Sequence, residues 1–167
     1  MTTTLVADAG PLIALARVRR LHLLNELFMS VLVPPEVHRE LRIDENRPGS
    51  RSLGEALDDG WLSVATLASG RESAFVSRAL DRGESEAIRL AEERAAILLI
   101  DDRRGRAAAR RRALRIVGTG GILLAAKRRS LLHDVGPVLL DLAEAGYRLS
   151  PGLVERILQM AGEADSL

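Results

Sequence analysis

The stretch AILLIDD at residues 96–102 is a continuous apolar run that ends in two aspartates. Five consecutive apolar residues, 96–100, are typical of a strand that is buried on both faces of a parallel sheet. The short, β-tolerant segment 4–7 likewise runs directly into an aspartate, Asp8. Helical sequence follows both segments, so each predicts a strand, a turn and a helix.

Strands and helices are expected to alternate along the rest of the chain. Further strand-like segments lie at 31–33, 61–67 and 114–117. Helices are predicted at 12–16, 21–28, 34–41, 84–94 and 103–113. A polar loop at 44–52 is followed by another predicted helix that ends near Gly60. The C-terminal part is predicted to be helical in three pieces, separated by Gly136-Pro137 and residues 150–152. This alternation predicts an α/β protein, a three-layer α/β/α sandwich around a short parallel sheet.

Length and composition favour one soluble domain. We expect a single domain over residues 1–167, extended by additional C-terminal helices from about residue 131. The chain is 47% hydrophobic and 28% charged, which argues against disorder, and its apolar runs are too short for a membrane span. We therefore expect a cytoplasmic protein that does not contact membranes.

The residue types limit which metals the chain can hold. There is no cysteine, which excludes disulfides and thiolate zinc sites. The three histidines, His22, His38 and His133, are scattered along the chain and argue against a histidine site. A bound metal must then have oxygen ligands, which favours Mg²⁺ or Mn²⁺.

Acidic residues stand where an open parallel sheet binds its ligands, beyond the carboxyl ends of the strands. They are Asp8 and the Asp101-Asp102 pair directly after two strands, Glu84 at the start of the helix that leads into the second strand, and Glu40 in the helix opened by Pro34-Pro35. Glu40 reaches this edge if its helix packs over the sheet. The pattern predicts one acidic cluster.

Each of these acids also has a purely structural interpretation. Asp8 and Asp102 are suitable N-caps for the helices that follow them, and Glu84 is a first-turn acid of the kind that a helix dipole favours. Glu40 can be an ordinary solvated residue beside the equally suitable Glu36. These structural roles do not explain why the acids all fall at one edge of the sheet.

A cluster of carboxylates needs a cation. Two like charges about 4 Å apart repel each other by roughly 4 kcal/mol at an effective dielectric constant near 20. The acids would therefore protonate or move apart unless a divalent ion neutralised them. Mg²⁺ prefers hard carboxylate oxygens, and such an ion can activate a water for in-line attack on phosphorus.

A strongly basic segment directly follows Asp102. It contains Arg103, Arg104, Arg106, Arg110, Arg111, Arg112 and Arg115. Arginine donors match phosphate well, so this helix is expected to hold nucleic acid beside the acidic site, chiefly through Arg103, Arg104, Arg106, Arg110 and Arg111. The structural alternative is a solvated helix face. Aromatic residues are few, which favours phosphate contact over base stacking.

Five motifs together resemble the PIN-domain family, and within it the stand-alone prokaryotic proteins related to VapC-type toxins. They are DAGPLIAL at 8–15, VPPEVHREL at 33–41, GESEAI at 83–88, LLIDDRRGR at 98–106 and GTGGIL at 118–123. The resemblance implies a parallel sheet between helices, a Mg²⁺ or Mn²⁺ site and an RNA substrate. It assigns catalytic roles to Asp8, Glu40, Glu84 and Asp102.

Three positions depart from the family pattern. Gly10 stands where PIN proteins commonly carry Ser or Thr, and Ile100 where many carry Thr. The third acid is Glu84, with Glu86 as a nearby competitor, where the family often has aspartate. These departures are consistent with slow or substrate-restricted catalysis.

The two adjacent aspartates are expected to differ in role. Alternate residues of a strand face opposite sides, so Asp101 and Asp102 cannot both point at one metal. Asp102 lies eighteen positions after Glu84, the spacing that the resemblance implies for the last two acids. We predict Asp8, Glu84 and Asp102 as metal ligands. Asp101 is predicted to join the metal site indirectly, by orienting an arginine or a water on the metal.

The sequence thus predicts a metal-dependent ribonuclease of PIN type, in the role of a toxin in a toxin–antitoxin pair. Its expected partners are RNA, a small antitoxin protein and a second copy of the chain in a homodimer. The alternative is a catalytically weak PIN fold that acts as an RNA-binding or protein-interaction module.

Overall fold

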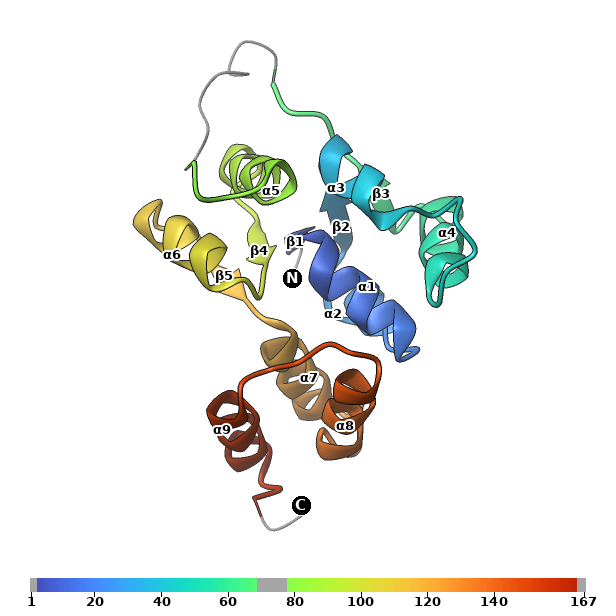
Figure 1. Ribbon diagram of the computed structural model, residues 1–167, viewed down its shortest axis with the longest axis vertical. Coiled ribbons are helices and arrows are strands. Elements are labelled where there is room, and N and C mark those ends of the chain that lie inside the picture. The colour runs from blue at the N-terminus through green and yellow to red at the C-terminus, as the bar shows by residue number, and fades with distance from the viewer. Residues whose placement is uncertain (1–2, 69–77, 165–167) are drawn as a thin grey trace.

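The computed structural model describes residues 3–68 and 78–164 and contains a five-stranded parallel sheet flanked by helices (Figure 1). The strands are β1 (Thr4–Ala7), β2 (Ser30–Val33), β3 (Leu62–Val64), β4 (Ile97–Leu99) and β5 (Ile116–Val117). Their order is β3-β2-β1-β4-β5, and every neighbouring pair is parallel. The predicted α/β/α fold class is confirmed.

The helices begin where the sequence provides caps or prolines. They are α1 (Ala9–Arg17), α2 (His22–Leu27), α3 (Pro35–Leu41), α4 (Ser50–Asp58), α5 (Arg82–Glu93), α6 (Arg103–Arg111), α7 (Thr119–Arg128), α8 (Gly136–Glu144) and α9 (Pro151–Ala161). Proline occupies the first turn of α3, α8 and α9, where its missing N–H is not needed. Among the described residues, no helix is both long and apolar enough to cross a membrane.

The two strands that end in aspartate form the centre of the sheet. Leu5 and Val6 of β1 and Leu98 and Leu99 of β4 are fully buried, as is Ile100 directly after β4. Helix α5 packs on both β1 and β4 and contacts α3 on one side and α6 on the other. The apolar run at 96–100 is therefore covered on both faces, as its composition predicts.

Some element ends differ from the expected ones for local reasons. The polar loop expected at 44–52 ends at Gly49, whose left-handed φ of 91° starts α4. A Cβ at this position would also lie 2.9 Å from the Cβ of Ala16, so only glycine fits. Helix α6 ends before Ala113, which has a φ of 56°. The strands expected at 61–67 and 114–117 are shorter, at Leu62–Val64 and Ile116–Val117.

Helices α7, α8 and α9 form the end of the molecule where the C-terminus lies (Figure 1). The carboxylate of Glu163, after α9, accepts hydrogen bonds from the amides of Val135 and Gly136 at the start of α8. It also pairs with Lys127 of α7 at 2.5 Å. These contacts hold α8 and α9 against α7. The loop between α8 and α9 contains Tyr147, whose hydroxyl contacts Asp101 after β4.

Candidate metal and nucleic-acid site

The carboxyl ends of β1 and β4 lie side by side at the point where the strand order reverses. The chain leaves β1 for β2 on one side, while β4 pairs with β1 on the other. The amide of Asp8 donates to the carbonyl of Leu99 at 3.0 Å, which joins the two strand ends. In open α/β sheets this reversal point is where ligands bind.

Asp8 is buried, and no Lys or Arg of residues 3–68 and 78–164 forms an ion pair with it. Only 8% of the residue is exposed, and its side chain does not cap α1. Burial raises the pKa of Asp8 to about 7, and the charges of Glu84, Asp81 and Glu40 add to this, while the Ala9 amide acts in the opposite direction. The N-cap interpretation of Asp8 therefore does not account for its side chain.

Glu40 and Glu84 come from two helices that pack against each other, α3 and α5. The carboxylate of Glu40 lies against Gly83, so closely that a Cβ on residue 83 would overlap it. Burial raises the pKa of Glu40 to about 7, and the charges of Asp81, Glu36 and Glu84 contribute. Burial and Asp81 also raise the pKa of Glu84. Glycine at 83 is what lets the acid from α3 approach α5.

Asp81 is a member of this acidic group that the sequence interpretation missed. Its carboxylate accepts a hydrogen bond from the Glu84 amide at 2.7 Å, and Glu84 Oε2 accepts one from the Asp81 amide at 3.2 Å. This is a capping box, and the signal for it was the pair Asp81 and Glu84 at a spacing of three. Glu84 thus has the structural role at the helix start and is still close enough to Asp8 to affect its pKa.

The competing glutamates, Glu36 and Glu86, are occupied elsewhere. Glu86 accepts a hydrogen bond from the Glu36 amide at 3.0 Å and pairs with Arg82 at 3.3 Å. Glu36 pairs with Arg39 and, at 3.8 Å, with Arg82. Within the described residues, no Lys or Arg forms an ion pair with Glu40 or Glu84. Because Glu36 and Glu86 form ion pairs and Glu40 and Glu84 form none within the described residues, Glu40 is favoured over Glu36 and Glu84 over Glu86 as a candidate site residue.

The two aspartates after β4 are held differently. Both carboxylate oxygens of Asp101 accept hydrogen bonds: from the Thr119 amide at 3.0 Å, from the Thr119 hydroxyl at 2.5 Å and from the Tyr147 hydroxyl at 2.5 Å. Asp102 is exposed and caps α6, with Oδ2 accepting from the Gly105 amide at 2.8 Å. The charge of Asp102 raises the pKa of Glu84, so Asp102 lies near Glu84 in the acidic group.

The acids share one electrostatic environment but are not drawn into contact. Among the described residues, no three acidic or histidine side chains lie close enough to hold a metal ion. The donor set nonetheless fits a hard divalent cation, because it consists of carboxylates whose mutual repulsion such an ion would relieve. The side chains of Glu84 and Asp102 each have a second oxygen beyond the one that caps a helix.

The arginines of α6 divide into exposed and structural residues. Arg103, Arg104, Arg110 and Arg111 are exposed, and the charge of Arg104 lowers the pKa of Glu84. Arg106 is half-buried, and its guanidinium donates to the carbonyl of Ile100 at 2.9 Å. Arg103 and Arg104 thus begin α6 directly after Asp102, Arg110 and Arg111 lie at its other end, and Arg106 supports the turn between β4 and α6.

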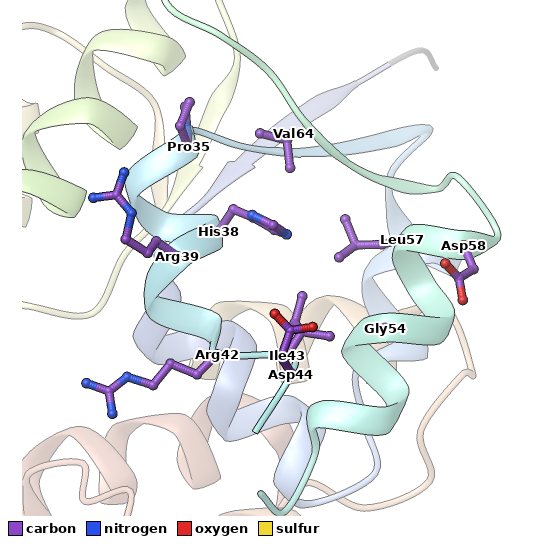
Figure 2. A pocket seen from close by; sticks show the side chains of 10 residues that line it. All are labelled: Pro35, His38, Arg39, Arg42, Ile43, Asp44, Gly54, Leu57, Asp58 and Val64. Carbon is purple, nitrogen blue, oxygen red and sulfur yellow. The ribbon is translucent and has the colours of Figure 1, made fainter. Parts of the chain in front are cut away.

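A separate hollow of about 590 Å³ lies between α3 and α4. Figure 2 shows His38 pointing into it, with the guanidinium groups of Arg39 and Arg42 extending away. None of the candidate acids Asp8, Glu40, Glu84 and Asp102 lines this hollow. The acidic site at the sheet edge and this hollow are distinct features.

The class of protein follows from a comparison with known families. Residues 4–163 match a family described as a PIN domain, and the chain belongs to the PIN-domain family. Members of this superfamily are nucleases that generally use divalent metal ions. The family resemblance inferred from the five motifs is therefore confirmed.

A solved structure supports the fold. The chain is similar to a PilT N-terminus domain protein from the hyperthermophilic archaeon Sulfolobus solfataricus, with a TM-score of 0.55 and 17% sequence identity. The similarity covers 74% of this chain and 93% of that one. No curated protein matches the chain significantly.

Proposed function

We propose that this protein is a Mg²⁺- or Mn²⁺-dependent endoribonuclease whose site is formed by Asp8, Glu40, Glu84 and Asp102. The observation that carries the proposal is the position of Asp8 at the end of β1, where burial raises its pKa to about 7 and the charges of Glu84, Asp81 and Glu40 add to this rise. An arrangement that keeps like charges together is unfavourable unless a cation binds there. Family membership supplies the nuclease class.

Each acid has a place in this proposal. Asp8, Glu84 and Asp102 would hold the metal, and Glu40, against Gly83, would complete the negative surface on the side of α3. When bound, a divalent ion supplies an activated water and offsets negative charge on the phosphate. Asp8 and Glu84 would position the ion and its water, because Asp8 directly follows β1, Glu84 lies on α5, and β1 and α5 pack against each other.

The exposed arginines of α6 would hold the RNA backbone. Arg103 and Arg104 begin the helix directly after Asp102, so phosphates bound there lie beside the acids. Arginine offers forked donors that suit phosphate oxygens. RNA binding would depend on contacts with the charged phosphates rather than on base recognition. The chain has only one Trp, one Tyr and two Phe on which bases could stack.

A cleavage assay on mixed RNA substrates with Mn²⁺ tests the proposal and separates the two adjacent aspartates. Asp102→Asn should abolish cleavage and the Mn²⁺-dependent rise in melting temperature together. Asp101→Asn should still bind Mn²⁺, about tenfold more weakly, and slow cleavage only in part, because its carboxylate faces Thr119 and Tyr147. If Asp101→Asn loses metal binding while Asp102→Asn keeps it, the assignment of the ligand is wrong by one residue.

RNA binding without cleavage is a second candidate function. It is favoured by two observations: in the described residues no three acids lie close enough to hold a metal ion, and Glu84 and Asp102 both cap helices. A wild-type protein that binds RNA equally well with EDTA and with Mn²⁺, and leaves it intact in both, would establish this candidate.

The basic helix is tested by salt dependence. Changing Arg110, Arg111 and Arg112 to Gln should weaken binding to unrelated RNA sequences, and each lost phosphate contact should reduce the slope of log affinity against log salt by about 0.7. The metal response should remain. A control with the same net charge replaces Arg42, Arg47 and Arg51, which pair with Glu45 and Glu55 away from α6. Equal slopes in both triple variants would reject phosphate binding by Arg110, Arg111 and Arg112.

A further inference from the structure

Tyr147 brings a hydroxyl to the acidic site from a distant part of the chain. It is the only tyrosine of the sequence and lies in the loop between α8 and α9. Its phenol donates to Asp101 at 2.5 Å across a sequence separation of 46 residues. A Cβ placed on Gly10, in the first turn of α1, would lie 4.0 Å from both the ring and the hydroxyl of Tyr147. Tyr147 therefore lies between the turn after β1 and the turn after β4.

A buried neighbour, Thr119, supports the hydrogen bond between Tyr147 and Asp101. Thr119, at the first position of α7, is fully buried and bonds the same Asp101 carboxylate through its amide and its hydroxyl. The half-buried Tyr147 donates to Oδ2 of Asp101, the same oxygen that accepts from the Thr119 hydroxyl. With three donors, the Asp101 carboxylate has a fixed orientation toward α7 and the α8–α9 loop.

We propose that Tyr147 is a positioning residue of the acidic site: through its hydrogen bond it fixes Asp101 and so sets the β4–α6 turn that presents Asp102 to Asp8 and Glu84. This inference rests on the proposed function, since positioning matters only if the acids act together. It gives the C-terminal helices a role, because α8 and α9 carry the loop that holds Tyr147. Residues that orient metal ligands commonly change metal affinity or activity 10- to 100-fold when they are replaced.

The test uses the full-length protein, Mn²⁺ and an RNA substrate. Tyr147→Phe keeps the ring and removes the hydroxyl, so it should raise the dissociation constant for Mn²⁺ and lower kcat, each by about tenfold, while KM for RNA stays within twofold. Asp101→Asn should have an effect of the same size. The double variant should be no worse than the more damaged single variant, because both changes act on the same contact between Tyr147 and residue 101.

Ser150→Ala is the matched control, because Ser150 caps α9 in the same loop and its hydroxyl accepts from the Leu153 amide. This change should lower the melting temperature without altering Mn²⁺ affinity or kcat. The inference is overturned if Tyr147→Phe binds Mn²⁺ and cleaves within twofold of wild type, or if the losses multiply in the double variant. A wild type that neither binds Mn²⁺ nor cleaves RNA rejects the proposed function instead, and with it this role of Tyr147.

Discussion

Asp8→Asn is expected to give a protein that no longer responds to Mg²⁺ and that is more stable than wild type without metal. The carboxylate of Asp8 is buried beside other acids, and at pH 8 its negative charge destabilises the folded state. The neutral amide has nearly the same shape and no such penalty. We expect the free energy of unfolding of the metal-free protein to rise by an amount on the order of 3 kcal/mol at pH 8.

Denaturant unfolding with and without millimolar Mg²⁺ measures both effects. Wild type should gain about 2.7 kcal/mol when the ion exceeds its dissociation constant a hundredfold, because the ion binds only the folded state. Asp8→Asn should gain almost nothing. The exposed Asp58→Asn, on α4, is the control and should behave as wild type. A metal-free Asp8→Asn protein that is less stable than wild type and still responds to Mg²⁺ would contradict the shared acidic site.

The stability of the metal-free protein should fall as the pH rises from 5 to 7. In the folded state the pKa values of Asp8 and Glu40 are about 7, above the ordinary values of 3.8 and 4.5. Between these limits the folded protein holds more protons than the unfolded chain, so raising the pH favours unfolding. Asp8 contributes up to about 1.4 kcal/mol per pH unit, and the more exposed Glu40 contributes less. Above about pH 7 the dependence should level off.

Metal binding should show the opposite dependence on pH. Only deprotonated carboxylates bind the ion, so the stabilisation by Mg²⁺ and the cleavage rate should both increase from pH 6 to pH 8. Unfolding measured at pH 5, 6, 7 and 8, with EDTA or Mg²⁺, separates the two trends. The double variant Asp8→Asn/Glu40→Gln is the control, and its metal-free stability should vary little with pH. A wild type whose metal-free stability increases over this range would rule out the raised pKa values.

Much of the fold follows from local patterns. The run at 96–100 predicted a doubly buried strand because a short run of five apolar residues is typical of a strand between two layers of helices. The prolines at 35, 137 and 151 marked helix starts because they lack an N–H that the first turn does not use. Strand ends were less predictable. They depend on pairing with neighbours, and β5 has only two paired residues.

Asp8, Glu84 and Asp102 could be predicted because each stands at the end of a strand or the start of a helix, whereas Glu40 lies near the end of α3 and was predicted from the family motif. The environment of each acid could not be predicted. Whether Asp8 caps α1 or stays unpaired depends on packing around β1, and the occupation of Glu36 and Glu86 by Arg82 depends on α3 meeting α5. Arg106 was expected at the nucleic-acid face, but its guanidinium binds the carbonyl of Ile100 within the turn.

By itself the sequence determined the parallel α/β fold, the PIN family and the acids at the strand ends, because apolar runs, prolines and caps act over a few residues. Only the tertiary structure decided that Glu40 lies against Gly83, that Asp101 is taken up by Thr119 and Tyr147, and that Asp8 carries an uncompensated charge. These properties depend on burial and on contacts between residues far apart in the chain. No local pattern encodes which distant side chain fills a given space, and for that reason Tyr147 had no signal in the sequence.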